Sequence, residues 1–91
     1  MLYTFSKAQY DAETLDTFLT HLNENDVVVL WQDGVLQAVK NQDFFAKLPR
    51  CYLLEQDVVA RGLNESLRIF KTLSLSEFIG LTEKNFPQIA L

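Results

Sequence analysis

Residues 27–39 read VVVLWQDGVLQAV, and this stretch decides the fold. Val27–Trp31 is a continuous run of apolar residues that starts with three β-branched valines, with no polar residue alternating between them. Such a run is typical of a central strand in a parallel sheet, which is covered on both faces. Gln32-Asp33-Gly34 breaks the run, and Asp33 is expected to cap a helix that holds Val35, Leu36 and Val39.

The segments before this stretch supply a strand and a helix. Met1–Phe5 is short and rich in β-forming residues, which predicts a first strand. Asp11 is expected to cap a helix over residues 12–23. Its apolar residues recur at i, i+3, i+4 and i+7 and predict one buried face, formed by Leu15, Phe18, Leu19 and Leu22.

After the central stretch, strands and helices continue to alternate. Pro49 ends the second helical layer, and Cys51–Leu54 and Ile69–Leu73 are predicted as the third and fourth strands. One or two helical turns over Val58–Arg61 end at Gly62.

The spacing of Ser74 and Glu77 is that of a capping box, which opens a last helix. This helix is expected to stop before Pro87 and to bury Leu75, Phe78, Ile79 and Phe86.

Repeated alternation of strand and helix predicts the fold class. The expectation is an α/β domain over residues 1–91, a small three-layer sandwich with a mostly parallel sheet of four or five strands. The first three strands are expected to be central and the fourth to lie nearer an edge. Gln88–Leu91 is either an additional edge strand or a segment that docks on a partner.

Composition argues against several classes of protein. Twelve acidic and eight basic side chains give a net charge of −4, and the basic residues are scattered along the chain, so direct nucleic-acid binding is not expected. The longest apolar run has five residues, and no signal peptide is visible. With Cys51 as the one cysteine, no internal disulfide can form, which favours a reduced, cytoplasmic protein without membrane contact.

The candidates for chemistry are few. The sequence has no phosphate-binding loop, dinucleotide fingerprint, CxxC or HExxH motif, so no cofactor or metal is expected. Cys51 is the obvious nucleophile, but Arg50 beside it points to the other face of a strand, and a buried structural cysteine is favoured. His21 alone makes neither a metal site nor a triad.

Two carboxylates and three aromatic residues are further candidates. Asp33 and Asp57 each follow a predicted strand, where α/β sheets bind ligands. Neither has a partner base or thiol in its loop, so helix capping is favoured over catalysis, and Asp57 is spaced to pair with Arg61. Trp31, Phe44 and Phe45 are candidate interface aromatics, because neighbouring Phe44 and Phe45 cannot both face one core.

The segments WQDGVLQAVK and LLEQDVVARGL resemble the TusB/DsrH family of sulfur-relay proteins. The resemblance also covers the opening MLYTF and the closing SEFIGLTEKN, and its motif residues are Gln32, Asp33, Gly34, Asp57, Arg61 and Gly62. It implies a small DsrE/DsrH-like α/β fold. In this family's complexes, a dimer of heterotrimers with TusC and TusD takes persulfide sulfur from TusA and passes it to TusE. The sulfur is used for 2-thiolation of the wobble uridine of tRNA.

The resemblance also implies a role without chemistry. The sulfur-carrying cysteine of such complexes belongs to TusD, so this chain is expected to be a noncatalytic subunit. Some DsrH relatives carry a cysteine in the first helix, at a place that corresponds to about Phe18, and residues 12–23 contain none. The alternatives are a sulfur carrier that uses Cys51, and a generic α/β interaction module.

Overall fold

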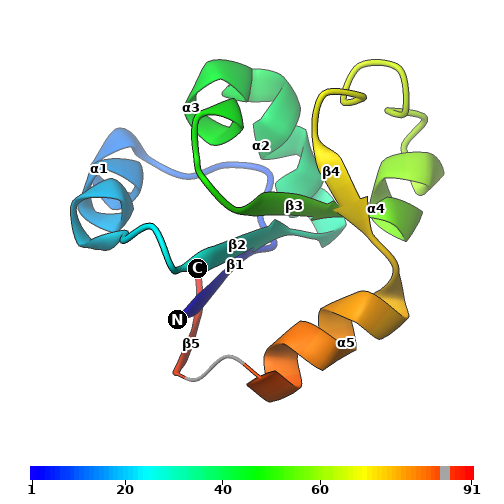
Figure 1. Ribbon diagram of the computed structural model, residues 1–91. Coiled ribbons are helices and arrows are strands. Elements are labelled where there is room, and N and C mark those ends of the chain that lie inside the picture. The colour runs from blue at the N-terminus through cyan, green and yellow to red at the C-terminus, as the bar shows by residue number, and fades with distance from the viewer. Residues whose placement is uncertain (85–86) are drawn as a thin grey trace.

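The structure is a computed structural model that describes residues 1–84 and 87–91 (Figure 1). Its strands and helices alternate along the chain, as the sequence predicts. The strands are β1 (Leu2–Phe5), β2 (Val27–Leu30), β3 (Cys51–Leu54), β4 (Lys71–Leu73) and β5 (Gln88–Ala90). The α-helices are α1 (Ala12–His21), α2 (Val35–Lys40), α3 (Gln42–Ala46), α4 (Glu55–Ala60) and α5 (Leu75–Lys84), and a 3₁₀ turn, η1 (Gln32–Gly34), precedes α2.

All five strands form one parallel sheet in the order β4-β3-β2-β1-β5. From β1 to β4 the chain steps in one direction across the sheet, and α5 then carries it back to the opposite edge. Right-handed crossovers put helices from opposite steps on opposite faces. Helices α1 to α4 accordingly cover one face, and α5 alone covers the other (Figure 1). The predicted three-layer α/β architecture is confirmed.

The central position of β2 explains its sequence. All four residues of Val27–Leu30 are buried, and β2 pairs with β1 on one side and with β3 on the other. Val28 and Leu30 face the layer of α1 to α4, whereas Val27 and Val29 face α5. The prediction of a strand covered on both faces is confirmed, and β1, β2 and β3 are internal while β4 lies at an edge.

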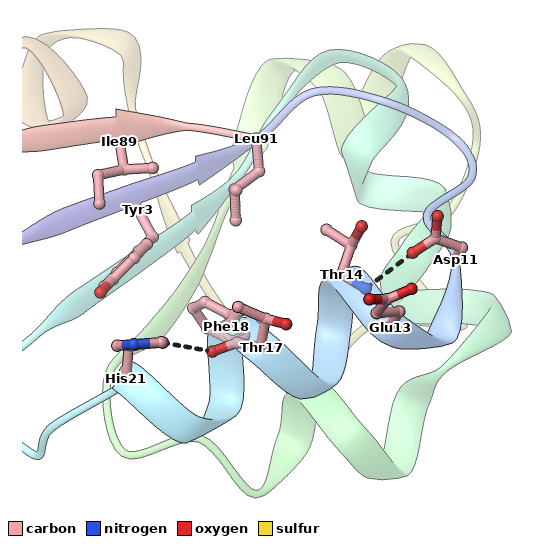
Figure 2. A pocket seen from close by; sticks show the side chains of 9 residues that line it. All are labelled: Tyr3, Asp11, Glu13, Thr14, Thr17, Phe18, His21, Ile89 and Leu91. Carbon is pink, nitrogen blue, oxygen red and sulfur yellow. Dashed lines mark hydrogen bonds between the residues drawn. The ribbon is translucent and has the colours of Figure 1, made fainter.

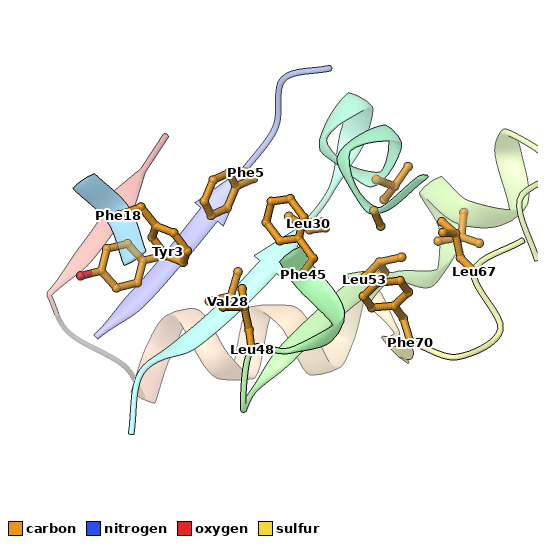
Figure 3. Packing of buried hydrophobic residues seen from close by; sticks show 13 residues of the cluster. Tyr3, Phe5, Phe18, Val28, Leu30, Phe45, Leu48, Leu53, Leu67 and Phe70 are labelled. Carbon is orange, nitrogen blue, oxygen red and sulfur yellow. The ribbon is translucent and has the colours of Figure 1, made fainter. Parts of the chain in front are cut away.

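The core between the sheet and helices α1 to α4 is built around aromatic rings (Figure 3). Phe5 is fully buried and makes edge-to-face contacts with Phe18 and Phe45, at ring-centroid distances of 5.0 and 5.5 Å. Tyr3 also meets Phe18 edge-on at 5.1 Å. Such pairs add to the hydrophobic gain from burial. This cluster fixes α1 and α3 over β1 and β2.

Two predicted helix starts are confirmed by their caps. The backbone N–H of Thr14 donates to Asp11 Oδ1 at 2.7 Å, so Asp11 caps α1. At α5, the N–H of Glu77 donates to Ser74 Oγ and the N–H of Ser74 donates to Glu77 Oε1, which is the reciprocal capping box.

Several predicted core residues are exposed instead. Ile69 is 62% exposed, and β4 begins only at Lys71, so the predicted strand was too long at its start. Leu19, Leu75 and Ile79, which were predicted to be buried, are also exposed. Leu75 and Ile79 are exposed because α5 alone covers its face of the sheet. Phe78 is buried against the sheet, while the flanking sides of the helix face solvent. Phe86, predicted to be buried, lies outside the described residues.

The last strand settles a question that the sequence left open. Gln88–Ala90 pairs in parallel with β1, so the C-terminal segment forms an edge strand (Figure 1). No helix in the described ranges 1–84 and 87–91 is long and apolar enough to cross a bilayer.

Candidate functional site

The turn after β2 holds a strained residue beside an obligatory glycine. Gln32 has a φ of +53°, a left-handed conformation that L-residues other than Asn and Asp seldom adopt. A Cβ atom on Gly34 would lie only 1.9 Å from the carbonyl oxygen of Phe5. The turn therefore passes directly over the end of β1, and only glycine fits at position 34.

Asp57, in the first turn of α4, supports this turn. Its Oδ2 accepts the backbone N–H of Gln32 at 2.6 Å, across 25 residues of sequence. An ionised acceptor makes such a bond stronger than one between neutral groups. The N–H of the strained residue is thus satisfied by a carboxylate from α4.

Arg61 joins the turn after β2 to helix α4. Its Nη2 donates to Asp33 Oδ1 at 2.7 Å, and its Nη1 donates to the backbone oxygen of Asp57 at 3.1 Å and lies 3.5 Å from Asp57 Oδ1. These contacts, above all the hydrogen bond to Asp33, raise the pKa of Arg61. The result is the cluster Asp33–Arg61–Asp57 at the carboxyl edge of the sheet, and both of its carboxylates are engaged by the same cation.

These contacts correct the prediction that Asp33 and Asp57 cap helices. Asp33 makes no side-chain hydrogen bond to the start of either η1 or α2, because the chain enters α2 through a 3₁₀ turn and its side chain is held by Arg61. Asp57 lies within the first turn of α4 and accepts from Gln32 rather than from its own helix. The predicted pairing of Asp57 with Arg61 is confirmed.

Glycine is required at position 62, directly after Arg61, for a separate and local reason. Gly62 has a φ of +65°, its N–H donates to the oxygen of Val59, and the N–H of Leu63 donates to the oxygen of Val58. This pair of bonds is the Schellman motif, which ends α4 as the sequence predicts. Arg61 is thereby fixed at the last turn of α4, facing Asp33.

Cys51 lies at the start of β3, away from this cluster. Burial raises the pKa of its thiol to about 12, so the reactive thiolate is nearly absent at neutral pH. His21 is exposed, and its Nδ1 lies 2.9 Å from the backbone oxygen of Thr17. Over residues 1–84 and 87–91, no three His, Cys, Asp or Glu side chains are grouped so as to hold a metal ion.

The three candidate interface aromatics differ in exposure. Phe45 is completely buried, so its assignment to an interface is wrong, and it belongs to the core around Phe5. Phe44 is half-buried against Phe18 and Phe45. Trp31 is half-buried against Phe78 of α5, and its indole Nε1 is buried without a hydrogen-bond partner among the described residues.

A groove beside α1 was missed by the sequence analysis. It has a volume of about 400 Å³ and lies between α1 and the strands β1 and β5 (Figure 2). The sequence feature that could have drawn attention to this region is its charge, because residues 8–39 contain six carboxylates and no lysine or arginine. Recognising the groove also required the position of β5 next to β1, which the sequence left open.

Comparison with known proteins assigns the chain to a family. A family model described as "DsrH like protein" matches residues 7–88. The chain belongs to the DsrH family. Among its relatives are proteins named Protein TusB from Pectobacterium carotovorum subsp. carotovorum (strain PC1) and Yersinia pestis (strain Pestoides F), at 38% and 35% identity over 99% of both chains. A relative from Haemophilus influenzae is 46% identical over the full length of both chains.

A solved structure has a similar fold. Protein Tm0979 from Thermotoga maritima, determined by solution NMR, superposes with a TM-score of 0.61 at 26% identity, covering 93% of this chain and 94% of that one. The DsrH-like fold is therefore confirmed by the structure and by sequence similarity.

In this DsrH-family chain, the place where the resemblance puts a helix cysteine is part of the core. Phe18 is buried and packs against Tyr3 and Phe5. No cysteine stands elsewhere in α1. Position 18 therefore contributes packing between α1 and the sheet in this member of the family.

Proposed function

We propose that this DsrH-family chain is a noncatalytic subunit of a cytoplasmic sulfur-relay complex that serves 2-thiolation of the tRNA wobble uridine. Its partners in this proposal are TusC-like and TusD-like subunits in a dimer of heterotrimers, with a TusA-like donor and a TusE-like acceptor. The observation that carries the proposal is the DsrH-family match over residues 7–88, together with TusB-named relatives that align over nearly the whole chain.

The state of Cys51 supports a role without covalent chemistry on this chain. A persulfide carrier needs an accessible thiolate, whereas burial raises the pKa of the Cys51 thiol to about 12. The Asp33–Arg61–Asp57 cluster offers no free base, because Arg61 engages both carboxylates. These residues instead hold two loops in fixed positions, which suits a surface that a partner subunit contacts.

Co-expression with TusC-like and TusD-like subunits from the same genome tests the proposal. We expect the three chains to co-purify and to elute together in size-exclusion chromatography. Failure to form any complex would favour the generic interaction module. A sulfur adduct on this chain, seen by intact mass after incubation with a persulfide donor and missing in Cys51→Ser, would favour the carrier alternative.

A further inference from the structure

The groove beside α1 has an apolar floor. Tyr3 of β1, Phe18 of α1, Ile89 of β5 and Leu91 line it, with Tyr3, Ile89 and Leu91 on the side of the strands and Phe18 on the side of α1 (Figure 2). Its volume of about 400 Å³ is large enough for a few side chains of a bound segment and far too small for a folded domain.

The rim of the groove is acidic at one end. Asp11 and Glu13 lie at the start of α1, where Asp11 caps the helix (Figure 2). Glu13 is exposed and has no ion-pair or hydrogen-bond partner within residues 1–84 and 87–91. Helix α1 and its cap, residues 11–21, contain three carboxylates and no lysine or arginine. This charge is complementary to a basic partner.

The groove lies next to an unprotected sheet edge. Gln88, Ile89 and Ala90 are all exposed. The N–H of Leu2 donates to the oxygen of Pro87, and the N–H of Leu91 donates to the oxygen of Thr4. Because alternate residues of a strand point their backbone groups to the same neighbour, Gln88 and Ala90 direct theirs outward. The opposite edge, β4, carries Lys71, a residue type that discourages strand addition.

We propose that an extended, basic segment of a partner subunit pairs with the outer edge of β5 and lays its lysine or arginine side chains in the groove. This inference rests on the proposed function and identifies the surface that meets a subunit of the complex. The aliphatic stems would cover Tyr3, Phe18 and Ile89, and the cationic ends would reach Glu13. Strand addition supplies main-chain hydrogen bonds, and a pocket for alternate side chains supplies specificity.

Charge disfavours a second copy of the chain as the occupant. A symmetric pairing of two β5 strands would bring two acidic grooves side by side, which is repulsive. A basic segment from another chain neutralises Glu13 instead. The partner is therefore expected to carry lysine or arginine at alternate positions of an extended stretch.

The test measures binding of full-length chain to a co-purified pair of TusC-like and TusD-like subunits. Glu13→Lys reverses a charge at the groove, and Asp16→Lys makes the same change on the same helix outside the lining of the groove. We expect a loss of about tenfold or more for Glu13→Lys and less than about twofold for Asp16→Lys. Ala90→Pro removes the outward N–H and leaves the bonds to β1, so it should weaken binding similarly.

The outcomes separate the two proposals. If Glu13→Lys binds with wild-type affinity, the proposal that the groove docks a partner segment is wrong, but the proposed relay function is unaffected. The same holds for an Ala90→Pro variant that circular dichroism shows to be folded. Equal losses in Glu13→Lys and Asp16→Lys also overturn the docking proposal, as would a homodimer of the isolated chain that Ala90→Pro dissociates. If Ala90→Pro unfolds, the Glu13 and Asp16 pair decides. If the wild-type chain binds neither subunit, the proposed function is wrong, and so is the docking proposal that rests on it.

Discussion

Arg61 Nη2 lies 2.7 Å from Asp33 Oδ1, although 28 residues separate the two side chains in the sequence. The contact ties the turn after β2 to the end of α4, and Asp57 completes it by binding both Arg61 and the N–H of Gln32. The residues of the two motif segments, QDGV and DVVARGL, therefore form one cluster at the carboxyl edge of the sheet.

Arg61→Ala is expected to lower the free energy of unfolding by about 1 kcal/mol. The figure is modest because Asp33 is 62% exposed, and solvent weakens such ion pairs. Urea unfolding at low and at high salt measures the change, which should shrink as salt screens the pair. Arg68→Ala is the matched control, because Arg68 is exposed and has no ion-pair partner within residues 1–84 and 87–91. Equal effects of the two substitutions would contradict the role of Arg61.

Gln32→Gly should raise the free energy of unfolding by roughly 0.5–1 kcal/mol. Glycine adopts a φ of +53° without the steric cost that glutamine carries, and this gain exceeds the added entropy of the unfolded chain. Gln32→Ala keeps a Cβ atom at the same φ and serves as the control, with no gain expected. Thermal unfolding of both variants provides the comparison, and the same Tm for the two would argue against strain at this turn.

Gly34→Ala and Gly80→Ala should act in opposite directions. At Gly34 the new Cβ would lie 1.9 Å from a backbone oxygen of β1, so the strand or the turn must move, at a cost of roughly 3 kcal/mol or more. At Gly80, inside α5, nothing lies within 4 Å of the added Cβ, so the substitution should stabilise by about 0.5–1 kcal/mol. The same shift of the urea midpoint in both variants would contradict this account of position 34.

The thiol of Cys51 should react slowly in the folded chain. Burial raises its pKa from 9.0 to about 12, so alkylation by iodoacetamide near pH 8 should be much slower than for the chain unfolded in urea. Rapid labelling of native protein at that pH would contradict the burial of this thiol.

The same pKa shift predicts a pH dependence of stability. Above pH 9 the unfolded chain loses the thiol proton while the folded chain keeps it up to about pH 12. Stability from this group is therefore fully present below pH 9 and falls as pH rises toward 12. Cys51→Ala should flatten that part of the profile of unfolding free energy against pH, and an unchanged slope would contradict the prediction.

Local patterns in the sequence predicted most of the fold for identifiable reasons. The run Val27–Trp31 indicated a doubly covered strand, and Ser74 with Glu77 indicated the start of α5. Both depend on residues near each other in the chain. Leu75 and Ile79 were misassigned to the core because the 3.6-residue period gives the face of a helix but not how much of that face the rest of the fold covers.

The candidate site was less predictable because its contacts are long-range. Asp33, Asp57 and Arg61 were identified, yet the partner of Asp33 lies in another loop, and a cap looked sufficient from local sequence. The groove required β5 to lie beside β1, a pairing between opposite ends of the chain. Neither relationship has a signature in the spacing of nearby residues.

The central claim, that this chain contributes a surface but no sulfur-carrying group, is tested most directly by sulfur transfer through the assembled complex. Complexes of TusC-like and TusD-like subunits with either the wild-type chain or Cys51→Ser would receive labelled sulfur from a TusA-like persulfide donor. Transfer to a TusE-like acceptor would then be followed over time. We predict the same rate for the two complexes. Loss of transfer in an intact complex that contains Cys51→Ser would contradict the account.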